Sequence, residues 1–255
     1  MDVIARIHND FPTKFGLPRQ SGLAPSLRAK IVFEPAYRVP EALRGLEGFS
    51  YIWLIWGFSA TSGATARAGL VERQVLSDPS APAGSEKVLQ RVGGPEPHWS
   101  PTVRPPRLGG NVRMGVFATR SPFRPNPIGL SSVRLESIED DGENGRVLIV
   151  SGADLMDGTP IYDIKPYLPG VDAHPDASDG FVGDHPQTLL EVEIAPELAA
   201  TLSAGQLAAL REILAQDPRP AYHAASASVP SRTYGFTYAG RDIHFTVEDN
   251  LIKAF

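Results

Sequence analysis

The residues best suited to chemistry in this sequence are six arginines in a segment without carboxylates. Between Pro97 and Leu135 the chain contains no Asp or Glu. The formal charge of the whole chain is −5, so the rest carries −11, which is −5 minus 6. Guanidinium groups bind carboxylates and phosphates in bidentate geometry. The segment is therefore predicted to meet anions, although some of its arginines could instead be structural members of a solvated loop: Arg104, Arg107, Arg113, Arg120, Arg124 and Arg134.

Glycines and prolines crowd the same segment, namely Gly109, Gly110, Pro122, Pro125 and Pro127. Proline fixes φ and glycine permits close backbone approach, so these loops can bring backbone groups near a ligand. The sequence has neither a phosphate-binding glycine loop nor a serine-nucleophile elbow. Its six histidines are scattered without ligand spacing, so we expect no metal site.

Length and composition restrict the class of protein. The chain has 255 residues, enough for one large domain or an ordinary domain plus a smaller one. It has no cysteine, which excludes disulfides and cysteine nucleophiles and fits a reducing compartment. The N-terminus lacks signal-peptide features, and the longest apolar run, residues 51–58, is too short to span a bilayer. We expect a cytoplasmic protein without membrane contact, and the net charge disfavours indiscriminate coating of nucleic acid.

The elements that must position the arginines are short strands rich in branched and aromatic residues. Turn formers at 140–145 predict an antiparallel hairpin. Long helices do not alternate with the strands, which favours a closed or nearly closed small antiparallel barrel over a doubly wound sheet. The predicted strands are 2–8, 30–34, 49–58, 112–119, 130–139, 145–152, 161–167 and 188–194.

The strand at 49–58 is apolar on both faces, which predicts cover on both sides. The barrel interior would cover one face. Either a second subunit, or a loop or helix of the same chain, would cover the other.

Stretches rich in Pro, Gly, Asp and Ser divide the chain. We predict a β-barrel domain over 1–170 with an inserted loop at 60–97, a linker at 171–187 and a small α+β domain over 188–255. In the last part, Ser203 and Gln206 have capping-box spacing before a helix that should stop ahead of Pro218. Segments 233–238 and 242–247 predict a final hairpin.

Six blocks of this sequence closely resemble the TrmO (TsaA-like) family of tRNA methyltransferases. Two of them lie almost end to end, PTVRPPRLGGN at 101–111 and MGVFATRSPFRPNPIGL at 114–130. The others are FGLPRQSG at 15–22, RGLEGFS at 44–50, DLMDGTPIYDIKPY at 154–167 and QDPRPAY at 216–222. The blocks occur in order and extend into the predicted C-terminal domain.

The resemblance implies a mainly β protein: a small antiparallel β-barrel that binds S-adenosylmethionine without the Rossmann glycine pattern, followed by a small α+β domain. It also implies a homodimer with cofactor sites near the interface. The implied substrate is N6 of threonylcarbamoyladenosine at position 37 of certain threonine tRNAs. Where the family commonly has a histidine and a polar neighbour, this chain has Ser59 and Ala60. Matching the blocks residue by residue gives as cofactor contacts Pro18, Arg19, Gln20, Arg120, Leu130, Met156, Asp157, Gly158 and Thr159.

The residue types suit methyl transfer from this cofactor. Arg19 or Arg120 can bind its carboxylate, and Asp157 can meet its ammonium group or ribose hydroxyls. Alignment of nucleophile, methyl carbon and sulfur can lower the barrier by roughly 7–11 kcal/mol, with no covalent enzyme intermediate.

The base nitrogen loses a proton as it gains a methyl group, so a nearby acceptor is useful. We expect Asp217 to accept it, Arg219 to pair with the threonyl carboxylate or a phosphate, and Tyr222 to stack on a base. The alternative for Asp217 is a helix-stop loop in which it caps backbone. Contacts to tRNA phosphates, and hence salt-dependent affinity, are expected from Arg104, Arg107 and Arg124.

Two other functions share these features. A non-enzymatic RNA-binding or S-adenosylmethionine-sensing module could use the same arginine-rich barrel. A methyltransferase acting on a small molecule would bind the cofactor but would leave the 217–222 motif without a role.

Overall fold

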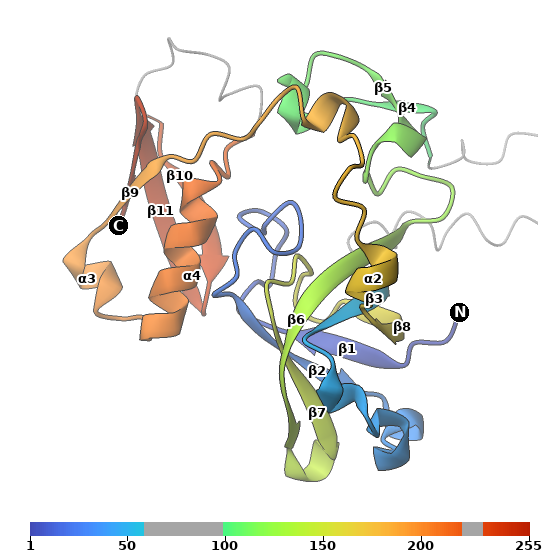
Figure 1. The fold of residues 1–255 in the computed structure, drawn as a ribbon. Coiled ribbons are helices and arrows are strands. Elements are labelled where there is room, and N and C mark those ends of the chain that lie inside the picture. The colour runs from blue at the N-terminus through green and yellow to red at the C-terminus, as the bar shows by residue number, and fades with distance from the viewer. Residues whose placement is uncertain (59–98, 221–231) are drawn as a thin grey trace, which may run out of the picture.

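The computed structural model describes residues 1–58, 99–220 and 232–255. Some residues named above therefore lie outside the described residues: Ser59, Ala60, Tyr222 and the predicted loop at 60–97. Within the described ranges the protein is mainly β, as predicted, with a barrel followed by a smaller α+β unit (Figure 1). No helix there combines the length and the apolar character needed to cross a membrane.

Six antiparallel strands close into a barrel in the order β1-β2-β7-β6-β3-β8. Apolar residues alternate with more exposed ones along these strands. Since successive side chains point to opposite faces of a strand, one set fills the barrel interior and the other faces outward. In the strand Tyr51–Gly57, the side chains of Ile52, Leu54 and Trp56 are buried in the barrel interior, whereas Tyr51 on the other face is exposed. The strands are β1 (Ala5–His8), β2 (Arg28–Phe33), β3 (Tyr51–Gly57), β6 (Ile128–Asp140), β7 (Arg146–Ser151) and β8 (Pro160–Pro166).

A glycine on β6 allows a tryptophan to fill the barrel. Gly129 lies opposite Trp56, and a Cβ atom at Gly129 would clash with the indole ring. The indole Nε1–H donates a hydrogen bond to Ser131 Oγ at 2.9 Å, which satisfies its one donor in the core. The hairpin predicted around 140–145 is confirmed, since β6 and β7 pair antiparallel from Arg134–Ser151 to Asp140–Arg146.

The strand predicted at 112–119 is wrong over most of its length. Within it only Met114–Gly115 (β5) forms a strand, which pairs with Thr102–Val103 (β4), and Val116–Ala118 forms a 3-10 turn. The pattern misled because Phe117, which reads as a buried strand position, is 73% exposed. Figure 1 shows this two-stranded element above the barrel, beside the segment that follows α2 (Pro169–Asp172).

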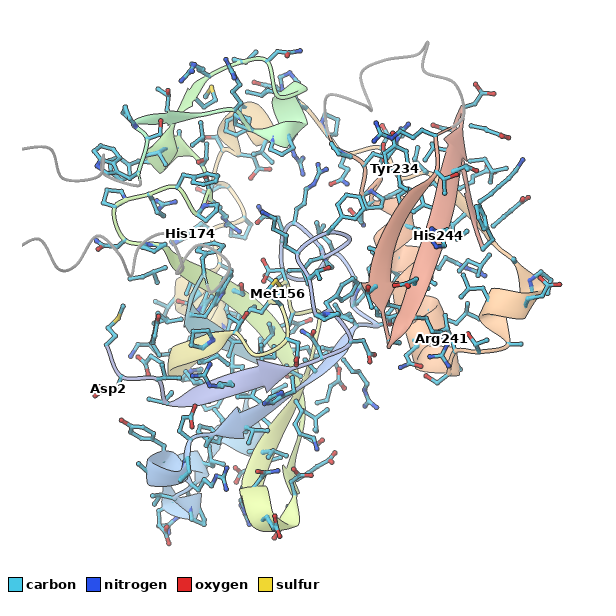
Figure 2. All side chains as sticks on the ribbon, turned by 180° about the vertical axis from the view of Figure 1, so that it is seen from behind. Asp2, Met156, His174, Tyr234, Arg241 and His244 are labelled. Atoms are coloured by element: carbon cyan, nitrogen blue, oxygen red, sulfur yellow. The ribbon has the colours of Figure 1, made fainter. Side chains whose placement is uncertain are left out.

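The C-terminal unit is a four-stranded sheet with helix α4 (Ala204–Ala215) against it. The predicted capping box is present: Ser203 Oγ accepts from the Gln206 amide, and Gln206 Oε1 accepts from the Ser203 amide. The hairpin predicted near Ala239 is confirmed, and Figure 2 labels Arg241 at its turn. The strand β12, which pairs parallel to β9, was not predicted from the sequence. The other elements are β9 (Glu191–Ile194), α3 (Pro196–Ala199), β10 (Tyr234–Tyr238), β11 (Arg241–Glu248) and β12 (Leu251–Ala254).

The N-terminal loop after β1 belongs to the hydrophobic core of the C-terminal unit. Phe11, Ala24 and Leu27 are buried there against α4 and the sheet. Ser26 donates to the Glu212 carboxylate from its amide at 2.8 Å and from its hydroxyl at 2.7 Å. These contacts hold the α+β unit against the loop that leads into the barrel, while the division at 1–170, 171–187 and 188–255 stays a prediction.

Candidate functional site

A cavity of about 360 Å³ lies on the outer wall of the barrel over β3 and β6. Its volume is within the range of small-ligand pockets. Outward-facing Leu130 and Ser132 of β6 alternate with inward-facing Ser131 and Val133 and form part of the floor. The full lining is Ser21, Tyr51, Trp53, Arg120, Leu130, Ser132, Tyr167 and Asp172.

Aromatic side chains from β3 and from the residue just after β8 provide the apolar part of this cavity. The ring centroids of Tyr51 and Tyr167 are 6.2 Å apart, and those of Trp53 and Tyr167 are 5.5 Å apart. The outer face of β3 is thus covered in part by residues of the same chain, through Tyr167 and α2. Such rings can accept a flat heteroaromatic group by stacking or edge contact.

One cation and one anion also line the cavity. The guanidinium of Arg120 donates a hydrogen bond to the side-chain oxygen of Gln20. Asp172 Oδ2 accepts from the Leu168 amide at 2.8 Å and from Trp53 Nε1 at 2.9 Å. These two hydrogen bonds, the backbone one being the larger effect, hold the pKa of Asp172 below its usual value. The carboxylate is therefore ionised at neutral pH.

A second carboxylate, Asp154, is outside the cavity lining but within electrostatic reach of Arg120. Trp56 Nε1 donates to Ser131 Oγ, and Ser131 Oγ in turn donates to Asp154 Oδ1 at 2.5 Å. The carboxylate also accepts from the Ser21 amide. Burial raises the pKa of Asp154, while the Ser131 hydrogen bond and the charge of Arg120 oppose the rise. Asp154 does not line the cavity, but its charge acts on Arg120, which does.

The predicted cofactor contacts divide between this cavity and other places. Arg120 and Leu130 line the cavity, and Gln20 reaches it through its bond to Arg120. Pro18 and Arg19 instead line a cleft of about 20 Å³ next to Asp217, which is too small for more than a water molecule.

The turn Met156, Asp157, Gly158 and Thr159 packs against the start of the chain and does not line the cavity. The Asp157 carboxylate accepts from the Asn9 amide at 3.1 Å and lies 3.3 Å from His8 Nδ1. Thr159 is buried. Figure 2 labels Met156 where this turn faces the N-terminal loop.

The C-terminal motif forms a compact ion pair beside the N-terminal loop. Arg219 binds the Asp217 carboxylate through Nε and Nη2, each at 2.8 Å, and these bonds raise the pKa of Arg219. Asp217 also accepts from the Arg219 amide at 3.3 Å, and Arg19 donates to the Arg219 carbonyl at 3.1 Å. Asp217 has a left-handed φ of 51° just beyond α4. The Asp217 side chain caps the backbone after α4 through the Arg219 amide, as the alternative hypothesis for this residue predicted.

The three arginines expected to touch RNA differ in their surroundings. Arg104 is exposed. Arg107 is half-buried and donates to the carbonyls of Val182 and His185, at 3.5 and 3.1 Å. Arg124 donates to the Thr119 carbonyl at 2.9 Å. Among the described residues, none of the three is within salt-bridge distance of a carboxylate, which leaves their charge available to an external anion.

Sequence reasoning missed Trp53 and Tyr167 as lining residues and Asp154 and Asp172 as charged ones. The block at 154–167 contains both Asp154 and Tyr167, but the reading placed its contacts at the following Asp-Gly-Thr turn. The signal that could have found Trp53 is the alternation of the long apolar strand, whose outward positions Tyr51 and Trp53 need a partner.

The small closed barrel has on its outer wall a cavity lined by aromatic rings, one arginine and one aspartate. These features define a ligand-binding barrel without Rossmann topology. The sequence profile of the tRNA-methyltransferase O N-terminal domain matches residues 6–80 and 87–173, and that of the TrmO C-terminal domain matches 187–255. The chain belongs to the tRNA-methyltransferase O family.

Curated relatives and solved structures agree with this membership. The chain is 36% identical to the tRNA (adenine(37)-N6)-methyltransferase of Escherichia coli K12, over 99% of this chain and 94% of that one. It is 39% identical to a putative S-adenosylmethionine-dependent methyltransferase, RcsF, of Pseudomonas aeruginosa, over 95% of this chain and 90% of that one. A crystal structure of P. aeruginosa TrmO superposes with a TM-score of 0.68 at 32% identity, covering 100% of this chain and 95% of that one.

Proposed function

We propose that this protein methylates the N6 nitrogen of adenosine 37 in tRNA with S-adenosylmethionine as methyl donor. The observation that carries the proposal is the cavity on the barrel wall, in a chain that belongs throughout its length to the tRNA-methyltransferase O family. The E. coli relative, which matches over nearly the whole of both chains, is named for the same reaction. Both expected alternatives, a non-enzymatic module and a small-molecule methyltransferase, are less well supported.

The cavity residues fit the donor group by group. Arg120 can bind a carboxylate in bidentate geometry, and Asp172 can accept from an ammonium group. The rings of Tyr51, Trp53 and Tyr167 can hold an adenine, and the nearby charge of Asp154, outside the cavity lining, would favour a cationic ligand. When bound, the donor supplies an electrophilic methyl group. The protein then mainly orients the reactants, a contribution of roughly 7–11 kcal/mol in well-oriented systems.

The remaining cofactor contacts are part of the proposal. Gln20 supports Arg120 directly. Pro18 and Arg19, and the turn Met156 to Thr159, would reach the donor only if the loops that carry them lie closer to it when donor and tRNA are bound.

For the substrate, we propose threonylcarbamoyladenosine at position 37 of threonine tRNAs. Arg219 suits the threonyl carboxylate because its guanidinium is already oriented by Asp217. Asp217 is proposed as the proton acceptor, although both its oxygens are engaged by Arg219, so it could take a proton only as that pair loosens. Tyr222 is proposed to stack on a base, and Arg104, Arg107 and Arg124 to bind phosphates.

We further propose a homodimer in a cytoplasmic setting. The apolar surface around the cavity continues onto Leu168 and Val171, which are 43% and 68% exposed, and a second copy would cover it.

The test is mass spectrometry of nucleosides from threonine tRNAs of a strain that lacks this protein. The proposal predicts loss of the N6-methylated form of threonylcarbamoyladenosine and its return when the wild-type chain is re-expressed. Purified protein with S-adenosylmethionine should restore the methyl group on tRNA from the deletion strain. Full methylation in the deletion strain would contradict the proposed function.

A further inference from the structure

Exposed aromatic side chains gather outside the cavity, in the arginine-rich segment. Phe117 is 73% exposed, Phe123 is 55% exposed and Trp99 is 36% exposed. The rings of Trp99 and Phe117 stack with centroids 6.4 Å apart and planes inclined by 24°. The guanidinium carbon of Arg124 lies 5.9 Å from the centre of the Phe117 ring. We call Trp99, Phe117, Phe123 and Arg124 the aromatic platform.

Backbone hydrogen bonds hold the platform in place. The Ser100 amide donates to the Phe123 carbonyl at 3.2 Å, and the Val116 amide donates to the Pro101 carbonyl at 2.9 Å. Residues flanking Trp99 are thereby tied to those flanking Phe117 and Phe123. Arg124 is fixed separately through the Thr119 carbonyl. Large apolar rings are costly to expose, and rings fixed in this way lose little conformational entropy when a ligand stacks on them.

The surroundings of the platform are cationic. It belongs to the segment between Pro97 and Leu135 that has no carboxylate. Arg104, just after β4, and Arg113, just before β5, are both exposed. The Arg113 guanidinium donates a hydrogen bond to Thr102 Oγ1 at 2.8 Å, which positions it. Arg120, which lines the cavity, lies between Phe117 and Phe123 in the sequence. The platform therefore combines flat apolar rings with positive charge, in the segment that also supplies Arg120 to the cavity.

We propose that the aromatic platform stacks an unpaired nucleobase of the tRNA loop that carries the target adenine. Aromatic rings set in a basic surface are the usual means of binding single-stranded RNA, because every base has a π-face and every nucleotide a phosphate. A protein partner would need a strongly acidic surface to match this segment. The inference rests on the proposed function and adds to it a contact surface that the cofactor cavity does not include.

The test compares Phe117→Leu with the wild type and with Phe117→Tyr. Binding is measured by fluorescence of anticodon stem-loops with 2-aminopurine at single loop positions, because stacking on an aromatic ring quenches this base. Phe117→Leu should weaken RNA binding by roughly 5- to 150-fold and reduce quenching at one position. Phe117→Tyr, which keeps the ring, should behave as the wild type. Affinity for S-adenosylmethionine should be the same in all three proteins.

Phe255→Leu is the matched control, since Phe255 is 53% exposed but lies on the C-terminal sheet against His244. It should leave RNA binding unchanged. Wild-type RNA affinity and tRNA KM in Phe117→Leu would overturn the inference while leaving the proposed function intact. The inference would also be overturned if Phe117→Leu sedimented as a smaller species than the wild type while it retained RNA affinity. That result would make the platform a protein interface. Failure of the wild type to methylate any tRNA would instead reject the proposed function.

Discussion

At the scale of single residues, the site depends on charges that the barrel holds at fixed places. Asp172 is anchored by a backbone amide and an indole, and Asp154 by a hydroxyl and a second amide. Asp172 lines the same cavity as Arg120, and Asp154 interacts electrostatically with the Arg120 guanidinium. A ligand with one negative and two positive groups complements this arrangement, and S-adenosylmethionine has that charge pattern.

The raised pKa of Asp154 makes donor binding sensitive to pH. Its usual pKa is 3.8, so in the folded protein the carboxyl becomes protonated at a higher pH than an ordinary Asp. Acidification through that pKa removes a negative charge close to Arg120, beside the proposed donor site. We expect wild-type affinity, measured by calorimetry over a series of decreasing pH values, to begin to fall at a higher pH than an ordinary aspartate would cause.

At pH values where Asp154 is ionised, Asp154→Asn should bind the donor roughly tenfold more weakly than the wild type, which is about 1.4 kcal/mol. It should also lose the pH dependence of binding. Asp140→Asn, at the exposed end of the β6–β7 hairpin, is the control and should titrate as the wild type. Equal pH profiles for Asp154→Asn and the wild type would show that Asp154 does not act on the donor.

At the scale of elements, helix α4 links the two parts of the protein. Its buried face, including Leu210 and Leu214, packs in the core that also takes up Phe11 and Leu27 from the N-terminal loop. Its end leads directly to Asp217. The orientation of the Asp217–Arg219 pair relative to the barrel thus depends on how firmly α4 is held.

Loss of the α4 cap should destabilise the protein without changing the cavity. Ser203→Ala leaves the Gln206 amide without its side-chain acceptor. We expect a loss of about 0.5–2 kcal/mol, seen as a lower midpoint in thermal or urea unfolding. Ser178→Ala, at an exposed loop serine, is the matched control. A Ser203→Ala midpoint equal to that of the control would mean that this cap contributes nothing.

At the scale of the whole molecule, the sequence predicts the barrel well because its signals are local. Alternation within β3 and β6 and turn formers at 140–145 each depend on a few neighbouring residues. The same holds for the capping box of α4. The 112–119 strand failed because exposed Phe117 imitates a core position, and only tertiary structure tells the two apart.

The site was predicted only in part because it joins residues that are distant in sequence. Arg120 and Leu130 come from the most distinctive block, whereas Trp53, Tyr167 and Asp172 reach the cavity through barrel closure and the α2 turn. Closure depends on strand register, which no short window specifies. The role of the N-terminal loop in the second core was missed for the same reason, since its buried residues lie in a turn-rich stretch without periodicity.

The account as a whole requires that the cavity on the outer barrel wall holds the methyl donor. The most direct measurement is calorimetric titration of S-adenosylmethionine into the wild type and into Leu130→Trp. Leu130 is 56% exposed and lines the cavity, so an indole there would fill the space with little effect on folding. We predict binding by the wild type and a loss of at least about 100-fold, near 2.7 kcal/mol, in the variant, with similar unfolding midpoints. Equal affinities for the two proteins would contradict the account.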